Sequence, residues 1–106
     1  MSEPKTIDFG GISGPVYTGR ERGEQLRSTL GLDVYDSEPG VVEVVIPPST
    51  YTISSSFFLG LFGPSVVKAG SKEAFYDRYH FTSPKFLENV MDGYVTRALQ
   101  SKNLFA

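Results

Sequence analysis

The sequence predicts an α/β fold: one domain over residues 1–106, with helices covering a mainly parallel or mixed central sheet of about four strands. Residues 41–46 (VVEVVI) are β-branched and apolar on both faces apart from Glu43, as in a central strand buried between helices. Segments with helical spacing alternate with short strand-like segments, which favours parallel strand–helix–strand units. The 106 residues are 40% hydrophobic, enough for one core.

The first strand and the first helix follow from local patterns. Residues 5–9 (KTIDF) alternate apolar and polar, which predicts a strand, and the Gly- and Pro-containing residues 10–15 predict a loop. Thr18 and Glu21 form a T-x-x-E capping box, which predicts a helix start. The apolar face of this helix contains Gly23, Leu26 and Leu30, whereas its charged residues, Arg27 among them, fill the solvent face, and Gly31 is expected to end it.

The middle of the chain joins a strand to a buried helix. Pro47 and Pro48 end the strand at 41–46, and residues 50–53 return as a short extended segment. Any of the three serines at 54–56 can cap the helix that follows. The apolar face of that helix consists of Phe57, Phe58, Leu61 and Phe62. Pro64 is expected to end or kink it, so that Val66 and Val67 belong to a second segment.

The last third of the chain predicts a short helix, a strand and a long helix. Residues 71–79 form an amphipathic helix capped by Ser71, and residues 79–82 (YHFT) form a strand. Ser83 followed by Pro84 predicts the start of the last helix. The apolar residues of this helix repeat at helical spacing: Phe86, Leu87, Val90, Met91, Tyr94, Val95, Ala98 and Leu99.

Composition excludes several classes of function. The chain has no cysteine and one histidine, which excludes disulfides and thiolate sites and argues against any bound metal. The net charge is −2 with scattered Lys and Arg, so neither a nucleic acid nor an anionic membrane is an expected partner. The N-terminus lacks a signal-peptide pattern, and glycines and Pro64 interrupt the longest apolar stretch. We therefore expect a soluble, cytoplasmic protein without a cofactor.

An enzyme is not expected either. A serine nucleophile needs a base, and His80 is the one candidate, with Asp77 the nearest acid in sequence. No G-x-S-x-G motif is present, and His80 between two aromatics is more typical of a hydrogen-bonded packing histidine. The Gly-rich loop at 10–14 lacks the lysine of a phosphate-binding loop. Asp33 and Asp36 are interpreted as solvated carboxylates.

The layout resembles the STAS domain (sulfate transporter and anti-sigma factor antagonist), and more closely its STAS-like branch of unknown function. Four segments carry the resemblance: GRERGEQLRSTL at 19–30, the strand VVEVVI, ISSSFFLGLFG at 53–63, and FYDRYHFTSP at 75–84. In STAS proteins of partner-switching systems, a D-S/T-S/T-G turn carries a hydroxyl residue that a histidine-kinase-like serine kinase phosphorylates. Here the aspartate position of that turn falls on Ser54, the hydroxyl positions on Ser55 and Ser56, and the glycine position on Phe57. The aspartate and the glycine are therefore absent.

The resemblance implies a non-enzymatic regulatory module that binds a protein partner, such as a histidine-kinase-like serine kinase or an anti-sigma factor. It implies Ser55 and Ser56, with Ser54 beside them, as the phosphorylation or switch residues. The expected partner contacts are Thr52, Ile53, Phe57 and Phe58. A flat apolar patch at the two phenylalanines would favour a protein partner, and a concave polar pocket would favour a ligand.

Three alternatives stay open. The first is a small-ligand or nucleotide-binding STAS-fold domain with its pocket at the same turn, and the second is a structural or host-interaction protein that reuses the fold. In the third, one serine caps the helix and its neighbours are merely solvated. Leu104 and Phe105 at the C-terminus either pack onto the core or form a homodimer contact.

Overall fold

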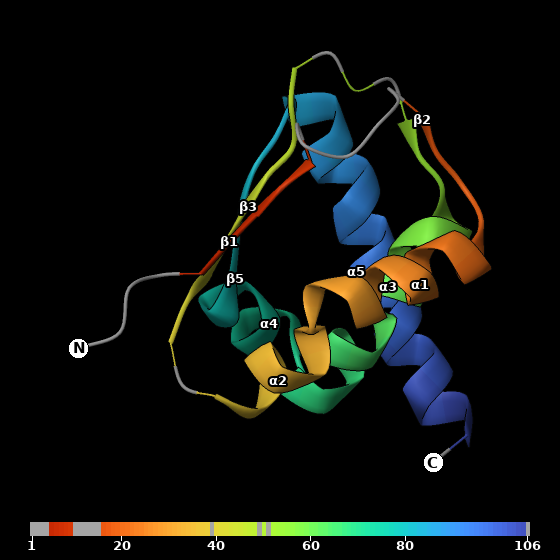
Figure 1. The fold of residues 1–106 in the computed structure, drawn as a ribbon. Helices are drawn as coiled ribbons and strands as arrows, with labels where there is room; N and C mark the ends of the chain where they lie inside the picture. The colour runs from red at the N-terminus through yellow and green to blue at the C-terminus, as the bar shows by residue number, and fades with distance from the viewer. Residues whose placement is uncertain (1–4, 10–15, 39, 49, 51, 106) are drawn as a thin grey trace.

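The structure, a computed structural model, describes residues 5–9, 16–38, 40–48, 50 and 52–105. It confirms an α/β fold with parallel strands (Figure 1). In chain order the elements are β1 (Lys5–Asp8), β2 (Val16–Tyr17), α1 (Arg20–Leu30), α2 (Leu32–Ser37), β3 (Val42–Val45), β4 (Thr52–Ile53), α3 (Ser55–Ala69), α4 (Lys72–Arg78), β5 (Tyr79–Thr82) and α5 (Lys85–Phe105). The predicted loop at 10–15 lies outside the described residues.

The main sheet has three parallel strands in the order β1-β3-β5. The strand predicted to be central, β3, is indeed the middle one. The expected fourth strand is not part of this sheet, because β4 pairs in parallel with β2 and forms a separate two-stranded sheet. Figure 1 shows this small sheet at the upper right, away from the main sheet.

Helices cover one face of the main sheet within the described part of the chain. Burial alternates along the strands: Ile7 and Val44 are buried, whereas Thr6 and His80 are exposed and Glu43 is half-buried. In Figure 1 the helices lie to one side of the three strands. The prediction of a strand buried on both faces is therefore wrong. The cause is the neighbouring strands, which place polar residues beside Glu43 on the outer face.

The helix ends match the sequence in part. Ser54 and Ser71 cap α3 and α4 by accepting hydrogen bonds from backbone amides, and Gly31 ends α1 with a φ of 71°. The capping box at Thr18 is wrong, because Gly19, with a φ of 92°, occupies the N-cap of α1 and no side chain caps it. Ser83 does not cap α5 with its hydroxyl, which is buried without a hydrogen-bond partner.

Helix α3 runs from Ser55 to Ala69 with Pro64 inside it, so the predicted helix end at this proline is wrong, and Val66 and Val67 belong to the same helix. The proline ring is exposed, and it removes one helix hydrogen bond. Burial of α3 against α1 and α5 outweighs that loss, since its buried residues extend on both sides of the proline, from Phe57 to Val66.

Helices α1 and α3 touch backbone to backbone at two glycines. A Cβ atom added to Gly23 would lie 2.3 Å from the Phe57 carbonyl oxygen, and one added to Gly60 would lie 2.3 Å from the Arg20 carbonyl oxygen. Only glycine fits at either position. The placement of Gly23 on the buried face of its helix is therefore confirmed.

Helix α5 packs against α3 with a narrower apolar face than predicted. Leu87, Met91 and Val95 are buried, whereas Phe86 and Val90 are 53% and 41% exposed. The side chains of Leu104 and Phe105 are outside the described part, so the open alternatives for them stay predictions. Among the described helices, none combines the length and the apolar character that crossing a membrane requires.

Candidate functional site

The serine turn lies between β4 and the first turn of α3. Ser54 Oγ accepts a hydrogen bond of 3.1 Å from the Phe57 amide, so this serine is the cap. Ser55 is half-buried, and Ser56 is exposed in the first turn. Thr52, in β4, is exposed as well. A hydroxyl at Ser56 is therefore open to solvent at the positive end of a 15-residue helix.

Three of the predicted partner contacts are core residues. Ile53, Phe57 and Phe58 are at most 2% exposed. The Phe57 ring packs edge-on against Phe9, with 6.5 Å between ring centroids, and the Phe58 ring packs against Phe62 at 5.3 Å. The two phenylalanines therefore form no apolar surface patch, and a partner at this turn would contact Thr52 and Ser56 instead.

Helix α1 brings a cation close to the serine turn. The guanidinium carbon of Arg22 lies 6.0 Å from the centroid of the Phe57 ring, within the range of a cation–π contact. The backbone contact at Gly23 holds this part of α1 against the start of α3. A phosphate on Ser56 would lie at the amides of the first helical turn.

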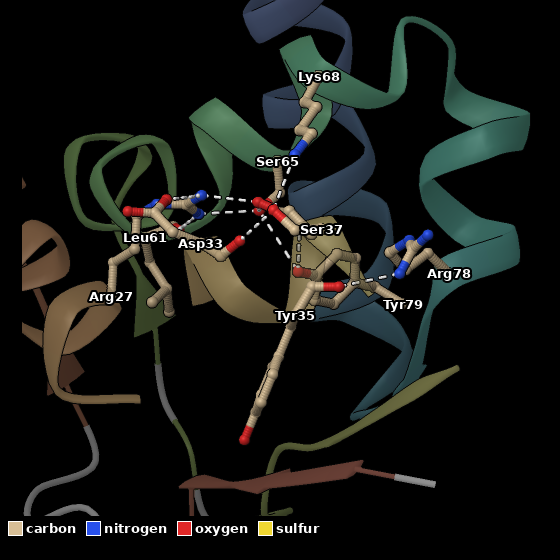
Figure 2. A network of polar contacts seen from close by, with 10 residues as sticks. Arg27, Asp33, Tyr35, Ser37, Leu61, Ser65, Lys68, Arg78 and Tyr79 are labelled. Carbon is tan, nitrogen blue, oxygen red and sulfur yellow. Dashed lines mark hydrogen bonds and ion pairs between the residues drawn. The ribbon is translucent and has the colours of Figure 1, made fainter. Parts of the chain in front are cut away.

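A buried polar network joins four elements at the opposite end of α1 (Figure 2). Arg27 Nη2 donates to Asp36 Oδ2 at 2.7 Å and to Asp33 Oδ1 at 2.8 Å. Its Nη1 donates to the Leu61 carbonyl oxygen at 2.9 Å and to Ser65 Oγ at 2.8 Å. The arginine of α1 is thereby tied to α2 and to α3, and its side chain is only 10% exposed.

Asp36 is the acceptor at the centre of this network, with a side chain 5% exposed. Tyr79 donates to its Oδ1 at 2.6 Å and Ser65 to its Oδ2 at 2.8 Å. Burial alone raises the pKa of Asp36, but the hydrogen bonds from Tyr79, Arg27 and Ser65 outweigh burial, so the pKa lies below 3.8. Burial and the bond to Asp36 raise the pKa of Tyr79. The carboxylate is therefore ionised and the phenol neutral at pH 7.

The network continues at the rim of a pocket of about 220 Å³. Lys68 Nζ donates to Ser37 Oγ at 3.3 Å, and Arg78 Nη1 donates to the carbonyl oxygens of Tyr35 and Glu38. Figure 2 shows the Tyr35 ring pointing away from the network. The donors and acceptors on the pocket floor pair with one another. This arrangement holds α2 against α3 and leaves few polar groups to bind a ligand.

The local sequence patterns do not predict this network. Asp33 is solvated as predicted, with 88% of its side chain exposed, but Asp36 is buried, so that interpretation is wrong for Asp36. Arg27 was assigned to the solvent face, although it stands four residues after Gly23 on the stripe that contacts α3. An arginine in line with the glycine of the buried helix face is the sequence signal that would have predicted a buried acidic partner.

The structure places the one candidate base, His80, on β5. His80 is not a packing histidine: its side chain is 49% exposed on the open face of the sheet, with Nδ1 3.7 Å from Glu43 Oε1. The serines stand at the start of α3, on a different element. Within the described ranges, no three His, Cys, Asp or Glu side chains are grouped to hold a metal ion.

Comparison of the chain with protein families, curated proteins and solved structures finds no match in any of the three.

Proposed function

We propose that this chain is a non-enzymatic protein-interaction module similar to the STAS-type antagonists of partner-switching systems, with Ser56 as its main switch residue. The observation that carries the proposal is the exposure of Ser56 in the first turn of α3, beside a Ser54 that already caps the helix. Ser54 is thus committed to structure, and half-buried Ser55 is the less accessible hydroxyl.

The fold gives such a switch a rigid support. The residues that follow Ser56 are anchored in the core, and the contact between Gly23 and the Phe57 backbone fixes the start of α3 against α1. A phosphate adds about −1.5 to −2 of charge at pH 7 without displacing a packed side chain. It would change the surface that a partner meets while the domain stays folded.

The test is intact-mass and phosphopeptide analysis of the tagged protein recovered from its native cells, with and without incubation in extract and ATP. We expect one phosphate on Ser56, and none in Ser56→Ala. Ser56→Asp should lose the partner that the unmodified protein retains, whereas Ser28→Asp, at an exposed position inside α1, should keep it. A protein that stays unmodified, and whose partner tolerates Ser56→Asp, would exclude the switch.

Ligand binding at the serine turn has less support. The pocket of about 470 Å³ that Phe58 borders includes none of the three serines and lies towards β5, α4 and α5. The turn itself exposes Thr52 and Ser56 at the start of a helix, and exposed side chains at a helix end suit a protein surface better than an enclosed small molecule.

A further inference from the structure

Strand β5 has a free edge in the described sheet. It pairs with β3 on one side only. The Ile46 amide donates to the Thr82 carbonyl oxygen at 2.8 Å, which turns the backbone of Thr82 towards β3. Since backbone groups alternate in direction along a parallel strand, His80 also faces β3 and the N–H and C=O of Phe81 face outward. These groups are where a further strand would pair.

A pocket of about 470 Å³ opens at this edge, between β5, α4 and α5. His80 and Phe81 both border it. Successive side chains of a strand point to opposite faces, so a pocket that touches both lies at the edge of the strand. The other edge of β5 is occupied by β3, and the pocket therefore lies beside the outward backbone groups of Phe81.

The walls of this pocket are aromatic and its rim is acidic. Tyr76 and Phe81 form part of the wall, with ring centroids 6.3 Å apart in an edge-on arrangement. Asp92 accepts from Tyr76 at 2.9 Å and from Lys72 at 2.8 Å, which balances its charge. Glu88, one turn earlier on α5, adds an exposed carboxylate. The rim is therefore net negative, and aromatic walls with a carboxylate favour a cationic group.

We propose that the free edge of β5 binds an extended segment of a partner protein, which adds a strand beside Phe81 and places a Lys or Arg side chain in the pocket. A peptide is favoured over a small amine because the pocket lies beside backbone groups that only another backbone pairs in register. The apolar stem of a Lys or Arg side chain suits the aromatic wall, and its charged end suits Glu88. This inference does not depend on the Ser56 switch, which stands on other elements.

The test is an NMR titration of the ¹⁵N-labelled protein with blocked pentapeptides Thr-Val-X-Val-Thr, where X is Lys, norleucine or Glu. We expect the Lys peptide to bind most tightly, with the largest shifts at the amides of residues 79–83. N-methylation of the central peptide backbone should abolish these shifts, because it removes the donor that pairs with the edge. Glu88→Gln should weaken binding of the Lys peptide about three- to five-fold.

The matched control is Glu73→Gln, which removes an exposed carboxylate of α4 that does not border the pocket. It should leave the affinity unchanged. Four results would overturn the proposal: no shift at residues 79–83 with any peptide, equal affinity for the Lys and Glu peptides, equal affinity for butylamine, or shifts that grow with protein concentration alone. The last would mean that a second copy of the chain covers the edge.

Discussion

Two successive turns of α1 contact α3 by opposite means. At Gly23 the helices touch through their backbones, and a Cβ atom would lie 2.3 Å from the Phe57 carbonyl oxygen. One turn later, Arg27 spans the interface with a long charged side chain, and Leu61 is a partner of both residues. The glycine brings the helices together and needs no partner. The arginine can be buried there only because its donors find acceptors on α2 and α3.

The largest expected effect comes from removing the arginine. Arg27→Met should lower the free energy of unfolding by about 3–5 kcal/mol, because it leaves the buried Asp36 carboxylate without its cation. Asp33→Asn, which changes the 88% exposed partner, should cost at most about 1 kcal/mol. Urea unfolding measures both. Equal losses of unfolding free energy for the two variants would show that the buried Arg27–Asp36 pair contributes no more to stability than the exposed Arg27–Asp33 pair.

The glycine contact should come next. Gly23→Ala is expected to cost about 3 kcal/mol, because the new methyl group meets backbone that cannot rotate away. The matched control is Gly93→Ala on α5, where nothing lies within 4 Å of the added Cβ. That variant should be more stable than the parent by about 0.5–1 kcal/mol. The reverse order in urea unfolding would contradict the backbone contact.

A double-mutant cycle tests whether the two turns act together. Gly23→Ala displaces α1 from Leu61, and Ser65→Ala removes one acceptor of Arg27. We expect the double variant to lose about 0.5–2 kcal/mol less than the sum of the single losses, since the displaced helix has already weakened the arginine contacts. Additive losses would mean that the glycine does not position the arginine.

The smallest effect is expected from pH. Because the native pKa of Asp36 lies below 3.8, the stability that it contributes is complete above pH 3.8 and is lost as pH falls through the native value. Thermal unfolding measured from pH 6 downwards should show this loss of stability. The slope of stability against pH below about pH 4 should be shallower in Asp36→Asn than in the parent protein. Lys72 and Tyr76 also lower the pKa of Asp92, so this carboxylate contributes to the same slope of stability against pH. Asp92→Asn is the control that measures the contribution of Asp92 separately from that of Asp36. A slope unchanged in Asp36→Asn would contradict a native Asp36 pKa below its ordinary value.

The local chemistry of the chain predicted most helix ends and strands. Ser54, Ser71 and Gly31 act as their residue types predict, because capping and left-handed turns depend on neighbouring residues alone. The predictions of a cap at Thr18 and of a helix end at Pro64 failed. Gly19 takes the N-cap that was expected at Thr18, and burial of α3 on both sides holds a helix together through a proline.

The candidate sites divide in the same way. The serine turn was found from its sequence, because a cap and an exposed hydroxyl in the first turn are local features. Phe57 and Phe58 lie on the apolar face that helical spacing predicts, and they are core rather than partner contacts because α1 and α5 pack against α3. The pocket at β5 is lined by residues of four elements, α3, α4, β5 and α5, so no local sequence pattern predicts it.

The sequence by itself determined the α/β class, the central position of β3, the Ser71 cap of α4, a serine cap for α3 and the glycine on the buried face of α1, since each follows from short-range sterics and hydrophobic spacing. The structure selects Ser54 among the three serines. Tertiary structure alone decided the partners of Arg27 and the exposure of one face of the sheet. Asp36 stands nine residues and Ser65 38 residues from Arg27, so only the packing of α2 and α3 against α1 brings their oxygens to the guanidinium. The buried charge is stable because those distant groups arrive together.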